Sequence, residues 1–213
     1  MQHRRDACAT KISHPVFGQI PLHITATESS LGGYCTMGVD TGRDLHVVIL
    51  RDEGWHQKRH LIHLAVCRDF LDLDLFMNRF NISRCVVDGL PETHATREFA
   101  KRYPGRVFMG VFNEFQRGSA KWDRQAMTVQ VNRTEALDAS RTAVREQKVV
   151  LPRRLPIVEE FAKHMASDAK ILDEDEETGI KKYRYIRTGV NHFSMAFTYA
   201  WLAGSDRVSY GGW

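Results

Sequence analysis

The sequence lacks the features of a zinc knuckle, a membrane span and a secretory leader. It has four cysteines, which lie far apart and form no Cys-x-x-Cys pair: Cys8, Cys35, Cys67 and Cys85. A zinc knuckle is therefore not expected. No run of about 18 apolar residues occurs, so no membrane span is predicted. Residues 1–10 are basic but have no apolar signal-peptide core. Cys35 and Cys85 stand inside apolar runs, as free core cysteines do, which favours a reducing compartment.

The composition is that of an ordinary globular chain. The 213 residues are 43% hydrophobic and 26% charged, so the chain can bury a large core without disulfides or a metal. The net charge of +4 suits a phosphate-binding surface without establishing one. Residues 1–33 contain scattered basic residues, two prolines and a Gly-Gly pair, and are predicted to be a linker or entry segment. We expect one domain over residues 34–204 and a flexible tail over 205–213.

The first half of that domain alternates strand-like and helix-like patterns. Residues 34–40 and 45–50 flank a polar turn and predict a β-hairpin, followed by a third strand within 56–67. Further segments follow in the order helix, strand, helix, strand: residues 68–81, 84–88, 91–103 (with Pro91 near the first turn) and 106–112. This alternation predicts parallel pairing in an α/β sheet.

The second half is expected to contain fewer strands. A strand is predicted over 128–131, and Thr134 is expected to cap a helix over 135–146. The remaining predictions are a helix, an acidic turn-like stretch, an exposed strand and an amphipathic helix, at residues 155–166, 170–177, 181–186 and 191–203.

Two of the predicted strands end on an aspartate, Asp40 and Asp88. Ligand sites in α/β sheets gather at the carboxyl ends of strands, so the two carboxylates converge if their strands are parallel neighbours. Paired carboxylates repel each other unless a cation lies between them. Oxygen ligands suit Mg²⁺ or Mn²⁺, and two such ions roughly 3.5–4 Å apart can promote phosphodiester hydrolysis. The alternative is that each aspartate is a turn residue, because each is followed closely by glycine.

Several short motifs carry a family resemblance. Met37-Gly-Val-Asp40-Thr-Gly, followed by a hydrophobic strand, resembles the first nuclease strand of viral terminase large subunits, and Cys85-Val-Val-Asp88-Gly resembles their second acidic strand. Further similar segments are Val131-Asn-Arg-Thr-Glu135, Leu151-Pro152, and Gly189-Val-Asn-His192 with the helix that follows it. The resemblance covers residues 34–203. It implies an RNase H-like mixed β-sheet flanked by helices, and a two-metal endonuclease that cuts double-stranded phage DNA during genome packaging.

The resemblance also names a third metal ligand at the start of the last helix. The family usually has aspartate there, whereas this chain has Asn191 and His192. A histidine still binds Mn²⁺ but suits Mg²⁺ less well. Catalysis is therefore expected to involve Asp40, Asp88 and His192, with Asn191 and Asp44 as further candidate ligands. The alternatives are that His192 and Asn191 merely begin the helix and that Asp44 is a loop residue.

The resemblance implies partners as well. The chain has no Gly-x-x-x-x-Gly-Lys-[Ser/Thr] loop, so ATP hydrolysis by that route is not expected. The ATPase motor is expected as another domain of the full-length terminase, with the portal and the small terminase subunit as further partners. No membrane partner is expected. The implied location is the cytoplasm of the infected bacterial host.

Basic residues beside aromatic ones suggest where DNA is bound. The candidates are Arg117, Lys121, Trp122, Arg124, Arg133, Lys181 and Lys182. Each could equally belong to a solvated face. The acidic run at residues 173–177 would repel DNA, so it is expected away from the cleft or on a mobile hairpin. Histidines without ligand spacing are interpreted as structural or exposed: His60, His63, His94 and His164.

Two other functions fit the same residues. A different RNase H-like enzyme, such as a resolvase, integrase or transposase core, would use the same acids without a motor partner. A non-catalytic module that docks on a portal or on DNA would explain why the third carboxylate is missing.

Overall fold

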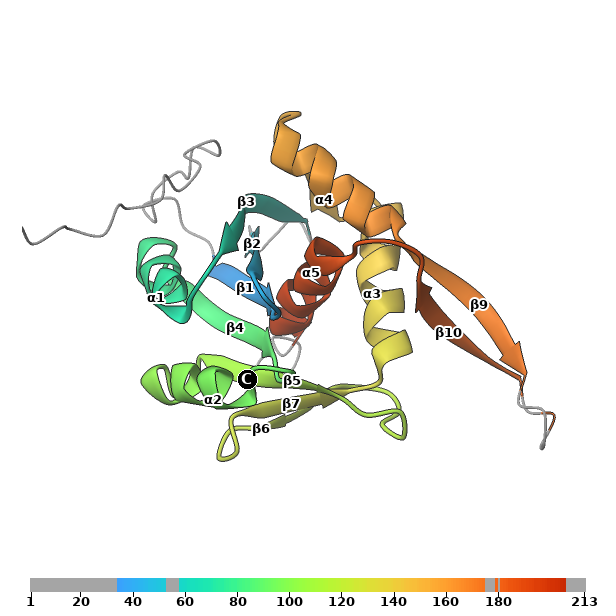
Figure 1. Cartoon of the computed structure of the whole chain (residues 1–213), viewed down its shortest axis with the longest axis horizontal. Helices are drawn as coiled ribbons and strands as arrows, with labels where there is room; N and C mark the ends of the chain where they lie inside the picture. The colour runs from blue at the N-terminus through green and yellow to red at the C-terminus, as the bar shows by residue number, and fades with distance from the viewer. Residues whose placement is uncertain (1–33, 53–57, 175–178, 180, 206–213) are drawn as a thin grey trace, which may run out of the picture.

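The computed structural model describes residues 34–52, 58–174, 179 and 181–205. Its main element is an eight-stranded mixed sheet in the order β6-β7-β5-β4-β1-β2-β3-β8 (Figure 1). The strands are β1 Tyr34–Asp40, β2 Leu45–Asp52, β3 Arg59–Cys67, β4 Ile82–Asp88, β5 Val107–Phe112, β6 Lys121–Asp123, β7 Thr128–Val131 and β8 Val149–Val150. The predicted segments 1–33 and 206–213, and the start of the third predicted strand at 56–57, lie outside the described residues.

The strand pairing follows the predicted pattern at its centre. β1, β2 and β3 pair antiparallel in sequence order, which confirms the hairpin, and β4 lies on the other side of β1 and parallel to it. β5 and then β7 continue the sheet in parallel with β4. The carboxyl ends of β1, β4, β5 and β7 therefore lie along one edge of the sheet, which we call the carboxyl edge.

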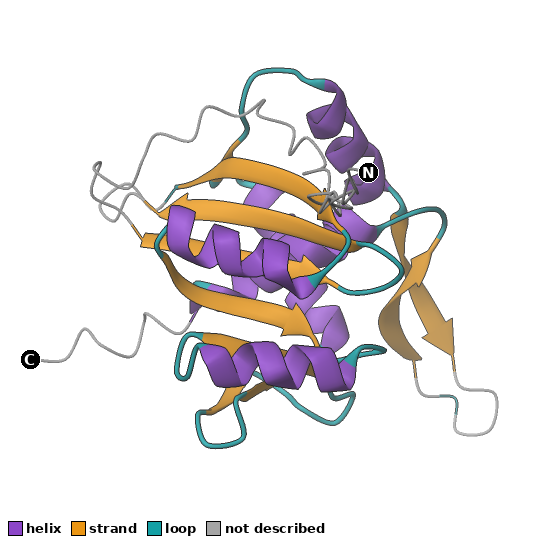
Figure 2. Cartoon of the chain, turned by 60° about the vertical axis from the view of Figure 1, so that its left-hand side comes forward, coloured by secondary structure: helices purple, strands orange, loops and turns teal. Residues whose placement is uncertain are grey.

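Helices cover both faces of the sheet (Figure 2). α1 Phe70–Arg79 and α2 Thr93–Arg102 pack on one face, and α5 His192–Ala203 crosses the other face over β1, β2 and β4. α3 Arg133–Arg145 and α4 Pro156–Ala166 flank α5. The architecture is the predicted mixed sheet flanked by helices.

The alternation of side chains along the strands decides which residues face α5. Met37 and Val39 of β1 belong to the core under α1 and α2, so Gly38 and Asp40 point to the α5 side. Val86 of β4 packs against α5 residues, and Asp88, two positions later, lies on the same face. Both aspartates are thus directed toward the face that α5 covers.

The expected N-cap of α3 is corrected. α3 begins at Arg133, and its N-cap is Asn132 rather than Thr134. The backbone of Asn132 is extended, as is usual for an N-cap residue. Its side chain accepts a hydrogen bond from the Glu135 N–H at 3.2 Å. Thr134 already lies in the first helical turn, where it cannot cap.

The acidic stretch predicted as a turn is a strand over most of its length. β9 Asp168–Glu174 pairs antiparallel with β10 Lys181–Arg187, which was predicted as a strand. Ion pairs across the hairpin offset the acidic charge that suggested a turn. Glu174 pairs with Lys181, which faces it, and Asp173 pairs with Arg184, which lies diagonally across from it. The hairpin projects from the body beyond α3 and α4 (Figure 1). β6 and β8 have only three and two residues, too few for a pattern to predict them.

Among the helices that the structure describes, none combines the length and the apolar character needed to cross a membrane.

His63 gives a prediction about acid stability. Burial, and secondarily the charge of Arg79, lower the pKa of His63 from 6.5 to about 4, and its Nε2 atom has no hydrogen-bond partner among the described residues. The unfolded chain therefore binds this proton first, so stability falls as the pH drops from 6.5 toward 4. Over this whole pH range, the pKa difference of His63 lowers the free energy of unfolding by about 3 kcal/mol.

We expect His63→Leu to remove that part of the acid sensitivity. Urea unfolding at pH 7 and pH 4.5 should show a drop in stability that is roughly 2–3 kcal/mol smaller in the variant than in wild type. His94→Leu is the matched control because His94 is exposed on α2. Equal drops in all three proteins would show that His63 does not resist protonation.

Candidate metal site and nucleic-acid interface

Asp40 and Asp88 end two neighbouring strands at the carboxyl edge. The register of β1 and β4 places Val39 beside Val87, so the two aspartates follow from adjacent positions on parallel strands. Asp40 is buried, with 6% of its surface exposed, and Asp88 is half-buried. The structure therefore brings together the pair that the sequence singled out.

The start of α5 brings His192 to Asp40. The two side chains meet at 2.8 Å between His192 Nδ1 and Asp40 Oδ2. The helix can approach the sheet this closely because Gly38 of β1 has no side chain and Thr36 Oγ1 donates to the Ala200 carbonyl at 3.1 Å. At the N-terminus of α5, the Phe193 N–H donates to His164 Nδ1 at 3.1 Å. His164 is buried and holds the helix start in place.

His46 completes this group, and sequence reasoning missed it. One ligand atom each of Asp40, His46 and His192 lies within 4.8 Å of the others. The rings of His46 and His192 stack with centroids 4.6 Å apart. His46 on β2 pairs directly opposite Asp40. The predicted hairpin already placed residues 45 and 46 near that position, which is the signal that could have identified His46.

The carboxylates resist ionisation where they lie. Burial raises the pKa of Asp40, although the hydrogen bond and charge of His192 oppose this. Burial raises the pKa of Asp88 to about 6, the Leu90 N–H opposes this as a donor, and the negative charge of Asp40 adds to the rise. A cation between the two carboxylates would offset both effects.

Tyr199 of α5 is a buried neighbour of both carboxylates. Burial and the negative charges of Asp88 and Asp40 raise its pKa well above the usual range, so its hydroxyl stays protonated. The charge of Asp88 acts on the hydroxyl. Among the described residues, however, the hydroxyl makes no hydrogen bond within the usual distance and angle limits. Gly110 of β5 leaves room for the ring, because a Cβ atom there would lie 2.8 Å from Tyr199 Cε1.

Two other candidate ligands are directed elsewhere. The Asn191 side chain is buried, and its Nδ2 atom donates to Asp168 Oδ1 at 2.7 Å. The Asp44 carboxylate lies in the turn after β1 and pairs with Arg43 at 3.3 Å. The structure thus places His192, and not the Asn191 or Asp44 side chain, in the group around Asp40.

Asp168 anchors the start of α5 to α3 and to the hairpin. Its carboxylate is fully buried and forms an ion pair with Arg141 of α3. It also accepts hydrogen bonds from Ser194 and Asn191 of α5. Because Asp168 begins β9, one side chain links α3, the hairpin and the helix that carries His192.

We expect Asp168→Asn to destabilise the fold by about 2 kcal/mol, because charge-assisted hydrogen bonds in a buried position are weakened. Urea unfolding at pH 7 would measure the loss. Asp138→Asn is the control, since Asp138 also bonds a cation, Lys170, but at a half-exposed site. A loss no larger than that of the control would show that the buried network contributes little.

The candidate DNA contacts divide between the two edges of the sheet. Lys121 faces Gln130 near the end of β7, and Arg117 lies in the preceding loop, so both are at the carboxyl edge. Arg133 begins α3 at the same edge and donates to the Tyr185 carbonyl at 3.0 Å. Arg124 follows Asp123, which faces the first residue of β7, and therefore lies at the opposite edge. The antiparallel turn of β6, which the sequence did not reveal, separates it from the others.

The remaining candidates lie away from the aspartates or pack against the core. Lys181 and Lys182 are at the far end of the hairpin, where Lys181 pairs with Glu174. The Trp122 ring packs edge-on against Phe108 at 4.8 Å, with Arg84 over it at 5.0 Å. Arg187, at the base of the hairpin, was not predicted from the sequence. It is exposed, and its charge acts on Asp40.

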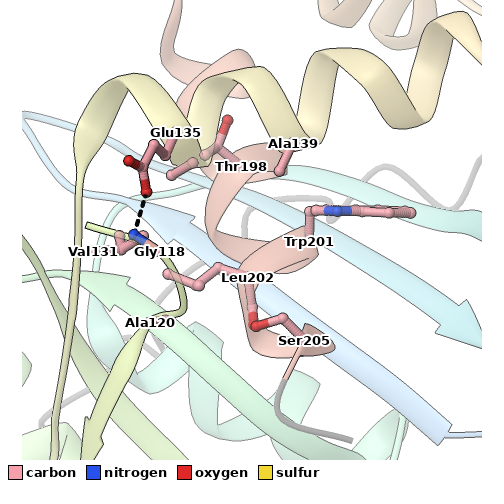
Figure 3. A pocket seen from close by; sticks show the side chains of 10 residues that line it. Gly118, Ala120, Val131, Glu135, Ala139, Thr198, Trp201, Leu202 and Ser205 are labelled. Carbon is pink, nitrogen blue, oxygen red and sulfur yellow. Dashed lines mark hydrogen bonds between the residues drawn. The ribbon is translucent and has the colours of Figure 1, made fainter. Parts of the chain in front are cut away.

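A shallow pocket lies between α3 and the C-terminal half of α5 (Figure 3). Its lining is mainly apolar and includes Val131, Ala136 and Leu202. Glu135 accepts a hydrogen bond from the Gly118 N–H at 3.0 Å across one side, which ties the loop that carries Arg117 to α3. The pocket is at the other end of α5 from His192, so it does not belong to the metal site.

The fold of this chain is similar to that of a solved phage nuclease structure. No protein-family model matches the chain, and no curated protein sequence is similar to it. The large terminase nuclease from thermophilic phage G20c superposes with a TM-score of 0.50 at 11% identity, over 80% of this chain and 82% of that one. Its magnesium-bound structure gives 0.50 at 10% identity, over 79% and 80%. At this identity the likeness is one of fold, and it confirms the RNase H-like mixed sheet.

Proposed function

We propose that this chain is a metal-dependent endonuclease that cuts double-stranded DNA, as the nuclease domain of a phage packaging terminase. The observation that carries the proposal is the convergence of Asp40, Asp88 and His192 at the carboxyl edge of an RNase H-like sheet. Its support from known structures is the shared fold with a large terminase nuclease, for which a magnesium-bound form exists.

The donor set fits a divalent metal. The pKa values of both carboxylates are raised, and among the described residues neither carboxylate forms an ion pair with a lysine or an arginine; Asp40 contacts the His192 imidazole. Asp40, Asp88 and His192 would hold two metal ions, which would be Mg²⁺ or Mn²⁺. When bound, such ions lower the pKa of water and neutralise charge on a phosphodiester. Tyr199 is buried beside the carboxylates and, because its pKa is raised, adds no negative charge there.

DNA would lie along the carboxyl edge. Arg117, Lys121 and Arg133 are at this edge, and the charge of the exposed Arg187 acts on Asp40. Cations in these places would bind backbone phosphates, which gives affinity without reading bases. Cutting with weak sequence preference is therefore part of the proposal.

The proposed partners follow from the role. An ATPase domain of the same terminase would drive DNA past this edge, and the portal and small terminase subunit would complete the packaging machine. The proposed location is the cytoplasm of the infected bacterial host.

One observation favours a second candidate function. The third position of the site is an imidazole, where the family usually has a carboxylate, as a domain that docks on a portal or on DNA without cutting could tolerate. A resolvase or integrase core would use the same two aspartates and differs in preferring branched or end-joined DNA.

Plasmid nicking tests the proposal. With Mn²⁺ or Mg²⁺ the wild-type chain should convert supercoiled plasmid to nicked and linear forms, and EDTA should stop the reaction. Because Asp88 shares the site, Asp88→Asn should lower the rate by at least about a hundredfold. Absence of cutting with either metal would favour the docking module, and faster cutting of four-way junctions than of plasmid would favour a resolvase.

A further inference from the structure

The two histidines beside Asp40 give the site a donor set that oxygen-only metal sites do not have. Asp40 comes from the end of β1, His46 from the start of β2 and His192 from the first turn of α5. Three separate elements thus direct one ligand atom each into a space where all three atoms lie within 4.8 Å.

The contact between His192 and Asp40 has the closeness of a shared coordination shell. His192 Nδ1 and Asp40 Oδ2 are 2.8 Å apart, and two atoms that each lie about 2.1 Å from one ion can be separated by such a distance. His46 stacks on His192 at an interplanar angle of 21°, so the two rings lie face to face. The Asp40 side chain is 9% exposed and that of His192 34%, which leaves the space partly open to water or phosphate.

One ring nitrogen of His46 is buried without a hydrogen bond of normal geometry among the described residues. This atom is Nδ1, although the Asp44 backbone is near the ring. Phe193 packs edge-on against the ring at 5.0 Å and fixes its orientation. An unpaired buried polar atom is unfavourable, and an ion coordinated by this nitrogen would give it a partner.

The geometry points to Asp40, His46 and His192 as a site for one divalent transition-metal ion of the Mn²⁺ to Zn²⁺ series, bound in preference to Mg²⁺. The inference rests on the proposed metal site and goes further, because it adds His46 as a ligand and assigns the metal class. Imidazole suits transition metals, whereas Mg²⁺ prefers oxygen and keeps several waters. Asp88 is outside the three-residue group and would serve the second, oxygen-rich position.

The competing explanation is that these three side chains bind no ion. Asp40 would then only orient His192, and His46 would only pack. His164 and Arg187 also approach this region, and both act electrostatically on Asp40, so a trio without metal would have cationic neighbours to balance its carboxylate.

Binding of Mn²⁺ alone separates the two explanations. The electron paramagnetic resonance signal of free Mn²⁺ is lost on binding, so titrating the full chain gives an affinity without any DNA or cleavage. We expect Zn²⁺ to displace bound Mn²⁺ at equal concentration and Mg²⁺ to need at least about a tenfold excess. His46→Ala should weaken Mn²⁺ binding at least about tenfold, with the thermal unfolding curve used to verify folding.

Two further variants make the test specific. His94→Ala removes an exposed histidine of α2, far along the chain from the group, and should leave Mn²⁺ binding unchanged. His46→Asp replaces the imidazole by oxygen and should let Mg²⁺ compete at least about fivefold better than in wild type. Unchanged Mn²⁺ affinity in His46→Ala, or displacement by equal Mg²⁺ in wild type, would overturn the inference.

Failure of this inference is distinguishable from failure of the proposed function. A chain that nicks plasmid but binds Mn²⁺ equally with and without His46 keeps the function and loses the inference. A chain that binds Mn²⁺ through His46 but cuts no DNA with any metal keeps the inference and loses the function.

Discussion

Replacing Asp40 with asparagine is expected to lower the rate of plasmid nicking by about a thousandfold or more. Asp40 is next to every other residue of the site. It contacts His192, lies opposite His46, and ends the strand that pairs with the strand of Asp88. Loss of its charge would remove several kcal/mol of metal-dependent stabilisation of the transition state, and about 4 kcal/mol corresponds to this factor. The rate would be measured with Mn²⁺ at saturating concentration, so that weaker metal binding alone does not explain the loss.

The fold should tolerate this substitution. Burial raises the pKa of Asp40, which means that its negative charge is unfavourable in the folded chain. Asp40→Asn should therefore melt at the same temperature as wild type or higher. Asp74→Asn is the matched control: Asp74 pairs with Arg102 on the surface, at α1 and α2, and its loss should leave nicking within about twofold. Nicking by Asp40→Asn at the wild-type rate would remove Asp40 from the mechanism.

Replacing Gly38 with alanine is expected to prevent stable folding. A Cβ atom at this position would lie 2.0 Å from the Ala196 carbonyl oxygen and 2.1 Å from the Ala200 nitrogen. Both atoms belong to the backbone of α5, so no side-chain rotation relieves the clash, and the helix would have to move away from β1. Overpacking usually costs about 1–3 kcal/mol, and a clash with a rigid backbone should exceed about 4 kcal/mol.

Thermal unfolding followed by circular dichroism measures this effect. The expected result is a melting temperature lower by more than about 10 °C, or no cooperative transition. Gly42→Ala is the control, because the nearest atom to its added Cβ is the Asp44 carbonyl oxygen at 3.8 Å. A Gly38→Ala protein as stable as Gly42→Ala would contradict the close packing of β1 against α5, and with it the placement of His192.

The central part of the fold was predictable because its signals are local. Apolar runs that end on Asp40 and Asp88 predicted strands, and the order of strands and helices predicted parallel pairing, which the register of β1, β4 and β5 confirms. The hairpin around residues 41–44 was predictable from turn chemistry for the same reason.

Other features depend on contacts between distant segments. His46 is one of several residues in a buried strand, and it stands out only when the register of the predicted hairpin is used to place it opposite Asp40. The link from Asp168 to Arg141 and Asn191 joins three elements that are separate in the sequence. Arg124 and Lys121 are three residues apart, yet β6 and its turn carry them to opposite edges of the sheet.

Above all, we infer that Asp40 and Asp88 share a divalent-metal site. Anomalous diffraction from crystals grown with Mn²⁺ tests this most directly. We predict an ion at about 2.0–2.2 Å from an Asp40 carboxylate oxygen and a His192 nitrogen, with the Asp88 carboxylate facing the same space. An Asp40 carboxylate without a bound ion at saturating Mn²⁺, or an Asp88 carboxylate turned away from that space, would contradict the claim.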